Sequence, residues 1–292
     1  MLQKIALGTV QFGIPYGINN HNGILGFQEI EEILRTAANA GITLLDTAPV
    51  YGDAEEKIGR FSEDSFKVVT KLPAREIGHP YSKEWLYDSV HESIKRLNVK
   101  KIYGLLLHKP GDLLEKDGEI FFSDLQNLKQ EGLVDKIGIS IYEPSELDVL
   151  CENYFFDIVQ APFNILDRRM IDSGWMDRLY KNGIEFHVRS VFLQGLLLMS
   201  PHIRPSKFNR WDSIWTKYDA WLVENKISAL QVCLMHVLSY KEINNVIIGI
   251  DSLDHLQKIL HASTLKGPII PSDISTNDTD LLNPLSWLKF QQ

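Results

Sequence analysis

Eight short apolar segments alternate with longer stretches of helical periodicity along most of this chain. The predicted strands are Ile5–Val10, Thr43–Asp46, Lys67–Thr70, Ile102–His108, Lys136–Ser140, Ile158–Ala161, Glu185–Ser190 and Val246–Gly249. Strands that alternate with helices form a parallel sheet, because each parallel strand needs a crossover that brings the chain back to the same edge. The alternation therefore limits the fold to the α/β class.

The predicted helices carry their apolar residues on one face. In Gln28–Ala40 the apolar residues recur at spacings of three and four, and Gly41 closes the helix. Similar faces occur in Ser82–Leu97, Phe121–Glu131, Pro144–Asn153, Asp172–Asn182, Ser228–Leu238 and Asp254–His261. Eight strands without a Rossmann glycine fingerprint favour a closed (β/α)8 TIM barrel over an open doubly wound sheet.

The length of 292 residues suits one domain of this kind, so we predict a single barrel over residues 1–292. Two segments exceed a minimal barrel. The Trp-rich segment Pro201–Asn225 is predicted as an insertion after the seventh strand with its own short helix. Residues 267–292 are predicted as a C-terminal tail that folds over the barrel rim.

The charge balance excludes several classes of partner. There are 30 Lys and Arg residues and 38 Asp and Glu residues, which gives a net charge of −8. Such a chain has no general attraction to nucleic acid or to an anionic membrane. The start does not resemble a signal peptide, and Cys151 and Cys233 have no metal-site spacing, so we expect reduced thiols in a cytoplasmic protein. The oligomeric state stays open.

Polar residues end most of the predicted strands. They are Asp46, Lys71, His108, Ser140, Gln160, Arg189 and Ser190. Taken singly, a lysine or histidine at a strand end is usually a solvated or structural residue. In a barrel, however, the active site lies at the C-terminal ends of the strands, and recurrence at the same end of successive strands favours a site there.

Tyr51, together with Asp46, Lys71 and His108, indicates a specific chemistry. A phenol with an ordinary pKa of about 10 exchanges its proton poorly near neutral pH. A nearby ammonium favours the phenolate, an aspartate can keep that ammonium charged, and a neutral imidazole can orient a carbonyl group. Such a set can protonate a carbonyl oxygen while a hydride arrives from elsewhere, or can act in reverse on an alcohol.

The run DTAPVYGDAEEKIG at residues 46–59 resembles the first signature of the aldo-keto reductase family. The later runs VVTK, LLLH, GIS, VQAPFN and VRSVFLQGLL follow in that family's order. The resemblance implies an oxidoreductase that acts on a small aldehyde, ketone or sugar with NADP or NAD. It implies that Tyr51 is the general acid/base, that Lys71 and Asp46 tune it, and that His108 positions the substrate.

The resemblance also implies a cofactor site at the barrel rim. Ser140 and Gln160 are expected to hold the nicotinamide carboxamide. The full set of expected cofactor-binding residues is Thr9, Asp46, Ser140, Gln160, Arg189, Ser190, Gln194, Gly249, Asp251, Ser252 and Gln257.

The chain departs from the family pattern at three places. Ile141 follows Ser140 where the family has Asn, so one carboxamide contact is lost or comes from a neighbour. Arg189 stands where many members have a Tyr that stacks on the nicotinamide. Its guanidinium could stack there too, or it could pair with Glu185 and never meet the cofactor.

The third departure concerns the choice of cofactor. No Lys or Arg occurs between Val246 and Gln257, where the family usually binds the 2′-phosphate of NADP. Asp251 and Asp254 occur there instead, and an acidic residue suits a ribose 2′-hydroxyl. The family norm indicates NADP and the local residues indicate NAD or dual use, so the choice stays open.

Substrate specificity is less constrained by the sequence. Candidate pocket residues are Phe12, Tyr16, Lys109, Trp211, Trp215 and Trp287. Lys109, next to His108, would favour an anionic substrate. Trp211 and Trp215 are four residues apart, so they could equally form the packing face of a helix.

Two other functions compete with this prediction. A metal-dependent barrel hydrolase needs clustered histidine and carboxylate ligands, but the nine histidines include no HxH pair, so we expect no metal. The alternative that we retain is a cofactor-sensing regulatory subunit of the same fold with little turnover.

Overall fold

Eight parallel strands close into one barrel in the computed structural model, which describes residues 2–18, 20, 23–61, 65–75 and 80–290. The strands are β1 (Ile5–Gly8), β2 (Leu44–Asp46), β3 (Lys67–Leu72), β4 (Ile102–Leu107), β5 (Val134–Ser140), β6 (Ile158–Pro162), β7 (Glu185–Arg189) and β8 (Asn245–Gly249). Neighbours in the chain pair with each other, and β1 also pairs with β8. The predicted (β/α)8 fold is confirmed.

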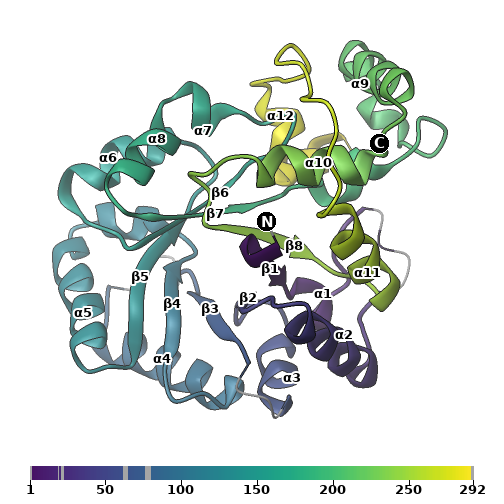
Figure 1. The fold of residues 1–292 in the computed structure, drawn as a ribbon. Helices are drawn as coiled ribbons and strands as arrows, with labels where there is room; N and C mark the ends of the chain where they lie inside the picture. The colour runs from purple at the N-terminus through teal and green to yellow at the C-terminus, as the bar shows by residue number, and fades with distance from the viewer. Residues whose placement is uncertain (1, 19, 21–22, 62–64, 76–79, 291–292) are drawn as a thin grey trace.

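The helices surround the strands (Figure 1). They are α1 (Val10–Gly13), α2 (Phe27–Asn39), α3 (Ala54–Arg60), α4 (Lys83–Leu97), α5 (Gly118–Gln130), α6 (Ser145–Asn153), α7 (Arg169–Asp172), α8 (Trp175–Lys181), α9 (Asp212–Asn225), α10 (Ala229–Leu238), α11 (Leu253–Ala262) and α12 (Thr279–Leu282). Short 3-10 helices are η1 (Leu2–Lys4), η2 (Pro110–Leu114), η3 (Leu193–Leu198), η4 (Ser206–Trp211) and η5 (Pro284–Phe290). No helix in the described ranges is long and apolar enough to cross a membrane.

Three local predictions were wrong. The first strand ends at Gly8, because Thr9 leaves the extended conformation and α1 begins at Val10. The short helix α3 was not predicted at all. The helix predicted over 172–182 begins only at Trp175, as α8, because Gly174, whose φ of 76° lies in the left-handed region, separates it from α7, which was not predicted.

The barrel interior explains why polar residues gather at one end. Six residues from six strands pack together inside it, namely Ala6, Leu44, Val69, Leu106, Ile158 and Ile247. Side chains alternate between the two faces of a strand, so the position two residues later faces the same interior. Those positions carry Gly8, Asp46, Lys71, His108, Gln160 and Gly249. The interior of the barrel is therefore apolar in one layer, and the next layer toward the C-terminal ends of the strands carries the polar side chains.

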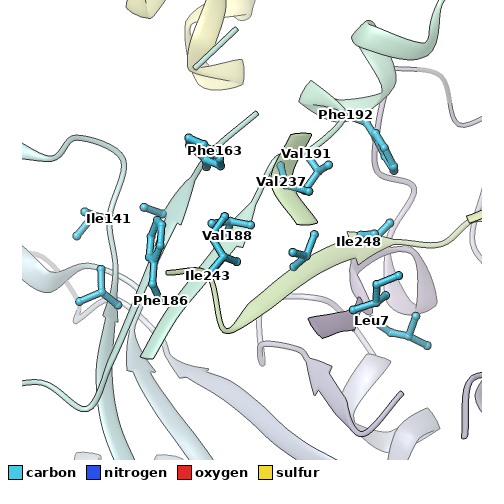
Figure 2. Packing of buried hydrophobic residues seen from close by; sticks show 14 of the residues in the cluster. Leu7, Ile141, Phe163, Phe186, Val188, Val191, Phe192, Val237, Ile243 and Ile248 are labelled. Atoms are coloured by element: carbon cyan, nitrogen blue, oxygen red, sulfur yellow. The ribbon is translucent and has the colours of Figure 1, made fainter. Parts of the chain in front are cut away.

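The opposite face of each strand packs against the helices. Figure 2 shows part of this larger cluster, including Leu7, Val188 and Ile248 on the strands and Val237 on α10. All four residues are buried. This apolar layer fixes the strands, and so it fixes the positions of the polar residues at their C-terminal ends.

The segment between β7 and α10 packs against the end of the chain. The Trp211 indole donates a hydrogen bond to Asp278 Oδ2 at 2.8 Å. The ring centroids of Phe208 and Trp287 lie 4.9 Å apart in an edge-on arrangement. These contacts hold η5 next to η4; residues 291–292 of the predicted tail lie outside the described residues.

Candidate active site

A cavity of about 520 Å³ opens at the C-terminal ends of the strands. Its lining includes every one of the four predicted catalytic residues, Asp46, Tyr51, Lys71 and His108. Nine of the predicted cofactor residues also line it, namely Thr9, Asp46, Ser140, Gln160, Arg189, Ser190, Gln194, Gly249 and Asp251. The strand-end residues that the sequence singled out thus face one space.

A buried ion pair lies at the base of this cavity. Lys71 Nζ is 2.6 Å from Asp46 Oδ1, and only 2% of Lys71 and 4% of Asp46 are exposed. Lys71 also donates a hydrogen bond to the Thr47 carbonyl at 2.9 Å. Burying two charges is costly unless they are paired and hydrogen-bonded, and both conditions are met here.

The ion pair lies beside the Tyr51 ring, since Lys71 Nζ is 5.2 Å from the ring centroid. Burial alone would lower the pKa of Lys71, but the charge of Asp46, the neighbouring Tyr51 and the Asp46 hydrogen bond outweigh it. The result is a raised pKa, so Lys71 stays charged at neutral pH. A fixed positive charge therefore stands next to the phenol.

Two glycines allow the backbone around Tyr51 to lie against α1. A Cβ on Gly13 would lie 1.7 Å from the Tyr51 carbonyl oxygen, a distance that no side chain can occupy. Gly52 has a φ of 61°, and a Cβ there would lie 2.6 Å from the Gly13 carbonyl oxygen. The Lys57 ammonium donates to the Phe12 carbonyl at 2.7 Å and ties α3 to α1. This close packing holds the turn that carries Tyr51.

His108 follows β4 and is neutral. Burial, and then the positive charges of Lys71 and Arg189, lower its pKa to about 4 against the opposing effect of Asp46. A neutral imidazole keeps one N–H donor and one acceptor nitrogen. At physiological pH it can therefore donate a hydrogen bond to a carbonyl oxygen while it remains uncharged.

Gln160 connects the ion pair to Ser140. Its Nε2 donates to Asp46 Oδ2 at 2.7 Å, and its Oε1 accepts from Ser140 Oγ at 3.1 Å. Asp46 therefore uses both carboxylate oxygens, one for Lys71 and one for Gln160. The sequence did not predict this link, because the two residues are far apart in the chain.

Arg189 lies at the rim of the cavity against Tyr142. The guanidinium carbon is 4.3 Å from the Tyr142 ring centroid, and the guanidinium donates to the Ile141 carbonyl at 3.0 Å. Arg189 does not pair with Glu185, because Glu185 forms an ion pair with Lys136 at the other end of the barrel. The Ile141 side chain is buried in the outer core, so only its backbone reaches Arg189.

The loop after β7 has an unusual backbone. Ser190, Leu193 and Gln194 have φ values of 59°, 47° and 54°. All three lie in the left-handed region, which is unfavourable for residues other than glycine. Gly195 continues this run with a φ of 91°. Such strain costs about 1–3 kcal/mol per residue and gathers at sites that bind ligands. The loop also crosses the cavity, because Gln194 Nε2 donates to the Tyr16 hydroxyl at 2.9 Å.

Two further features of the lining leave a polar group and space for a ligand such as a nicotinamide dinucleotide. Gln11 Oε1 is buried and has no hydrogen-bond partner among the described residues. A Cβ on Gly249 would lie 2.6 Å from Gln11 Nε2, so a side chain there would displace the Gln11 amide, which lines the cavity. The site therefore offers an unused polar atom and space kept open by glycine.

The loop after β8 contributes an acidic residue to the cavity. Asp251 lines it, and its Oδ1 lies 2.8 Å from His255 Nδ1. The hydrogen bond from His255 is the main reason why the pKa of Asp251 is lowered. Ser252 caps α11 and Gln257 is exposed on α11, so neither of these two predicted cofactor residues lines the cavity.

Of the candidate substrate residues, only Tyr16 lines the cavity. Phe12 and the three tryptophans are buried in the core, which favours the packing interpretation of the Trp pair. Lys109 pairs with Asp112 at 3.0 Å and lies outside the lining. Lining residues that the sequence did not indicate include Gln11, Tyr142, Leu198, Leu285 and Leu288. Apart from Tyr142, they lie on α1, η3 and η5, at positions with no strand pattern to predict them.

Metal ligation finds no support in the geometry of the described ranges. Nowhere in them do three His, Cys, Asp or Glu side chains gather as ligands for a metal ion.

The profile of the Aldo/keto reductase family matches residues 4–276. This chain belongs to the aldo-keto reductase family. The match runs from the start of β1 to beyond α11, so it includes all eight strands but not η5, which also lines the cavity. The curated relatives described next are named as reductases.

Two curated relatives of this chain come from Escherichia coli. The L-glyceraldehyde 3-phosphate reductase is 28% identical over 213 residues, which is 66% of this chain and 60% of the relative. The NADH-specific methylglyoxal reductase is 28% identical over 223 residues, which is 67% of this chain and 65% of the relative. This chain thus spans less than two thirds of either relative.

Among solved structures, the holo form of an aldo-keto reductase from Bacillus halodurans superposes with a TM-score of 0.72. The two chains are 20% identical, and the match covers 93% of this chain and 89% of the other. At 20% identity, this structural similarity is evidence for the fold alone.

Proposed function

We propose that this protein transfers a hydride between a nicotinamide cofactor and the carbonyl or alcohol group of a small aldehyde, ketone or sugar. The observation that carries the proposal is the buried Lys71–Asp46 ion pair beside Tyr51, in one cavity with His108. A phenol next to a fixed ammonium can give up a proton and take it back near neutral pH.

Tyr51 is proposed as the general acid in reduction and the general base in oxidation. Its hydroxyl donates the proton to the carbonyl oxygen as that oxygen gains negative charge. Lys71 stabilises the phenolate that is left, and Asp46 keeps Lys71 charged and oriented. The neutral His108 donates a hydrogen bond to the same oxygen and fixes its direction.

Ser140 and Gln160 are proposed to hold the carboxamide group of the nicotinamide. When the cofactor is bound, its nicotinamide ring would supply the hydride. Gln160 Oε1 accepts from Ser140 and retains a second lone pair for the carboxamide N–H. The Ser140 hydroxyl can rotate to donate to the carboxamide oxygen. That donor would replace the one that Ile141 cannot supply.

NADH is proposed to bind at least as tightly as NADPH. Asp251 lines the cavity, and the cations in the described lining are Lys71 and Arg189, both at the catalytic end. A carboxylate suits a 2′-hydroxyl and repels a 2′-phosphate. Titration of tryptophan fluorescence with each nucleotide would measure both dissociation constants. A tenfold lower Kd for NADPH would contradict this choice.

The role of Tyr51 is tested by Tyr51→Phe with methylglyoxal and glyceraldehyde 3-phosphate, the compounds for which the two relatives are named. We expect kcat to fall by about 100-fold or more, because the variant lacks the proton donor. The Kd of NADH should change little. Tyr180→Phe, which alters an exposed tyrosine on α8, is the matched control.

Near-normal turnover in Tyr51→Phe would remove Tyr51 from the mechanism. A wild-type protein that binds NADH but reduces none of a broad panel of carbonyl compounds would instead favour the alternative, a cofactor-sensing regulatory subunit.

A further inference from the structure

The charges that line the cavity are paired, with one exception. Lys71 pairs with Asp46, and Asp251 pairs with His255. Arg189 also lines the cavity, but no carboxylate of the described residues lies within ion-pair distance of its guanidinium. The catalytic end of the cavity therefore carries one uncompensated positive charge in a protein whose net charge is −8.

The surroundings of Arg189 hold its guanidinium in place without neutralising it. The Tyr142 ring covers it, and its two hydrogen bonds go to the Ile141 carbonyl at 3.0 Å and to Ser190 Oγ at 3.4 Å. A guanidinium has five N–H donors in a planar fork, and these contacts occupy two of them. A planar group fixed by stacking and by the backbone is ready to bind a second ligand.

The charge of Arg189 acts on the groups at the reaction centre. It contributes to the lowered pKa of His108, after burial and Lys71, and it opposes the rise in the pKa of Lys71. It also acts on Tyr16, across the cavity. Arg189 lines the same cavity as His108 and Tyr51, the residues proposed to contact the substrate carbonyl.

We propose that Arg189 is a specificity-determining residue that binds an anionic group, a carboxylate or a phosphate ester, on the carbonyl substrate. This inference rests on the proposed function, because it names the substrate class of the same site. A guanidinium binds either anion through two parallel hydrogen bonds, and such charge-assisted bonds are among the strongest in proteins. Lys109, the cation that the sequence suggested for this purpose, is paired with Asp112 outside the cavity.

Two pairs of substrates that differ in charge test the proposal. The first pair is succinic semialdehyde and butanal, and the second is glyceraldehyde 3-phosphate and glyceraldehyde. The wild type should prefer the anionic member of at least one pair in kcat/KM, and the pair in which it does so identifies carboxylate or phosphate. A wild type that prefers the neutral member of both pairs would overturn the proposal.

The decisive variant is Arg189→Met, which keeps an unbranched side chain and removes the guanidinium and its charge. The ratio of kcat/KM for the anionic and neutral members should fall by about 10- to 100-fold, the effect of one or two charged hydrogen bonds. Arg189→Lys should retain part of the preference. Lys109→Met, which removes a nearby charge outside the cavity, should leave both kcat/KM values unchanged.

An equal loss on both members with a raised Kd for NADH would assign Arg189 to the cofactor and overturn the proposal. Calorimetric titration of NADH-loaded protein with succinate and with inorganic phosphate tests the anion site separately from the proposed hydride transfer. If the wild type reduces no carbonyl compound but binds either anion, and Arg189→Met does not, the proposed function fails and the anion site stands. If neither anion binds the wild type and the charged substrates show no preference, the anion site is wrong.

Discussion

At the scale of single residues, Asp46 connects the parts of the site. Its two carboxylate oxygens accept from Lys71 and from Gln160, and its backbone carbonyl accepts from the Thr9 hydroxyl at 3.1 Å. Each partner comes from a different strand or strand end, so Asp46, through its carboxylate and its backbone carbonyl, joins three sides of the barrel. Its main electrostatic task is to balance the Lys71 charge.

This pairing predicts non-additive losses of stability. Asp46→Asn leaves the buried Lys71 ammonium without a counter-charge and should cost about 3–5 kcal/mol in the free energy of unfolding. Lys71→Met should cost a similar amount for the opposite reason. The double variant leaves neither charge and should cost less than the sum of the two. Urea unfolding of the three variants measures this, and additive losses would show that the two residues do not interact.

The residues of the site were predictable where they follow a strand pattern and not elsewhere. Asp46, Lys71 and His108 end apolar runs, so their shared location followed from the barrel alone. The bond between Gln160 and Asp46 joins residues 114 positions apart, and no local pattern encodes it. The same holds for Tyr142, whose stacking on Arg189 depends on how the loop after β5 lies against the end of β7.

At the scale of elements, the position of Tyr51 depends on α1 and α3. Gly13 ends α1 and lies against the backbone of the Tyr51 turn, where a Cβ would lie 1.7 Å from the Tyr51 carbonyl oxygen. Gly13→Ala must therefore displace one of the two segments. We expect kcat to fall by at least about tenfold, because the proton donor moves, and stability to fall by about 1–3 kcal/mol.

Gly111→Ala is the matched control, because a Cβ there would meet no atom within 4 Å. Steady-state kinetics and thermal unfolding of both variants decide the matter. If Gly13→Ala retained the wild-type kcat, the close packing of α1 would not determine the position of Tyr51.

Element boundaries were predictable for long amphipathic helices and not for short ones. The periodic face of α2 is long enough to identify a helix. The seven residues of α3 have no capping side-chain hydrogen bond, and the helix is held by tertiary contacts instead. Its buried Glu55 accepts from Thr70 Oγ1 at 2.6 Å on β3 and from Arg96 Nε at 2.8 Å on α4. Those partners are distant in the chain, so the sequence did not reveal them.

At the scale of the whole molecule, the barrel buries a histidine that limits stability in acid. His236 on α10 stacks on Phe163, and its Nε2 has no hydrogen-bond partner among the described residues. Burial, and then the charge of Arg168, lower its pKa to about 3. In the unfolded chain a histidine titrates near pH 6.5, so between these values the unfolded state binds more protons.

The contribution of the neutral His236 to the free energy of unfolding is therefore fully present above about pH 6.5. It is lost as the pH falls toward 3. Near pH 5 this one group should reduce the free energy of unfolding by about 1 kcal/mol per pH unit. His236→Phe keeps a ring against Phe163 and removes the titration. Urea unfolding at several pH values should show a shallower acid loss in the variant; parallel curves would mean that His236 does not contribute.

The architecture as a whole was the most predictable level. Eight strands with intervening helices have few ways to close, and the apolar strand faces set the register of the barrel. The docking of η5 against η4 was not predictable, because it depends on an aromatic cluster formed by Phe208, Trp211, Trp287 and Phe290. That docking places Leu285 and Leu288 at the cavity.

The most direct test of the central claim is isotope transfer from the cofactor. The protein is incubated with the carbonyl panel and with NADH or NADPH that carries deuterium at both C4 positions, and the products are analysed by mass spectrometry. Hydride transfer predicts an alcohol with one deuterium on the former carbonyl carbon, formed much more slowly by Tyr51→Phe. An alcohol without deuterium, or no alcohol from any member of the panel, would contradict the account.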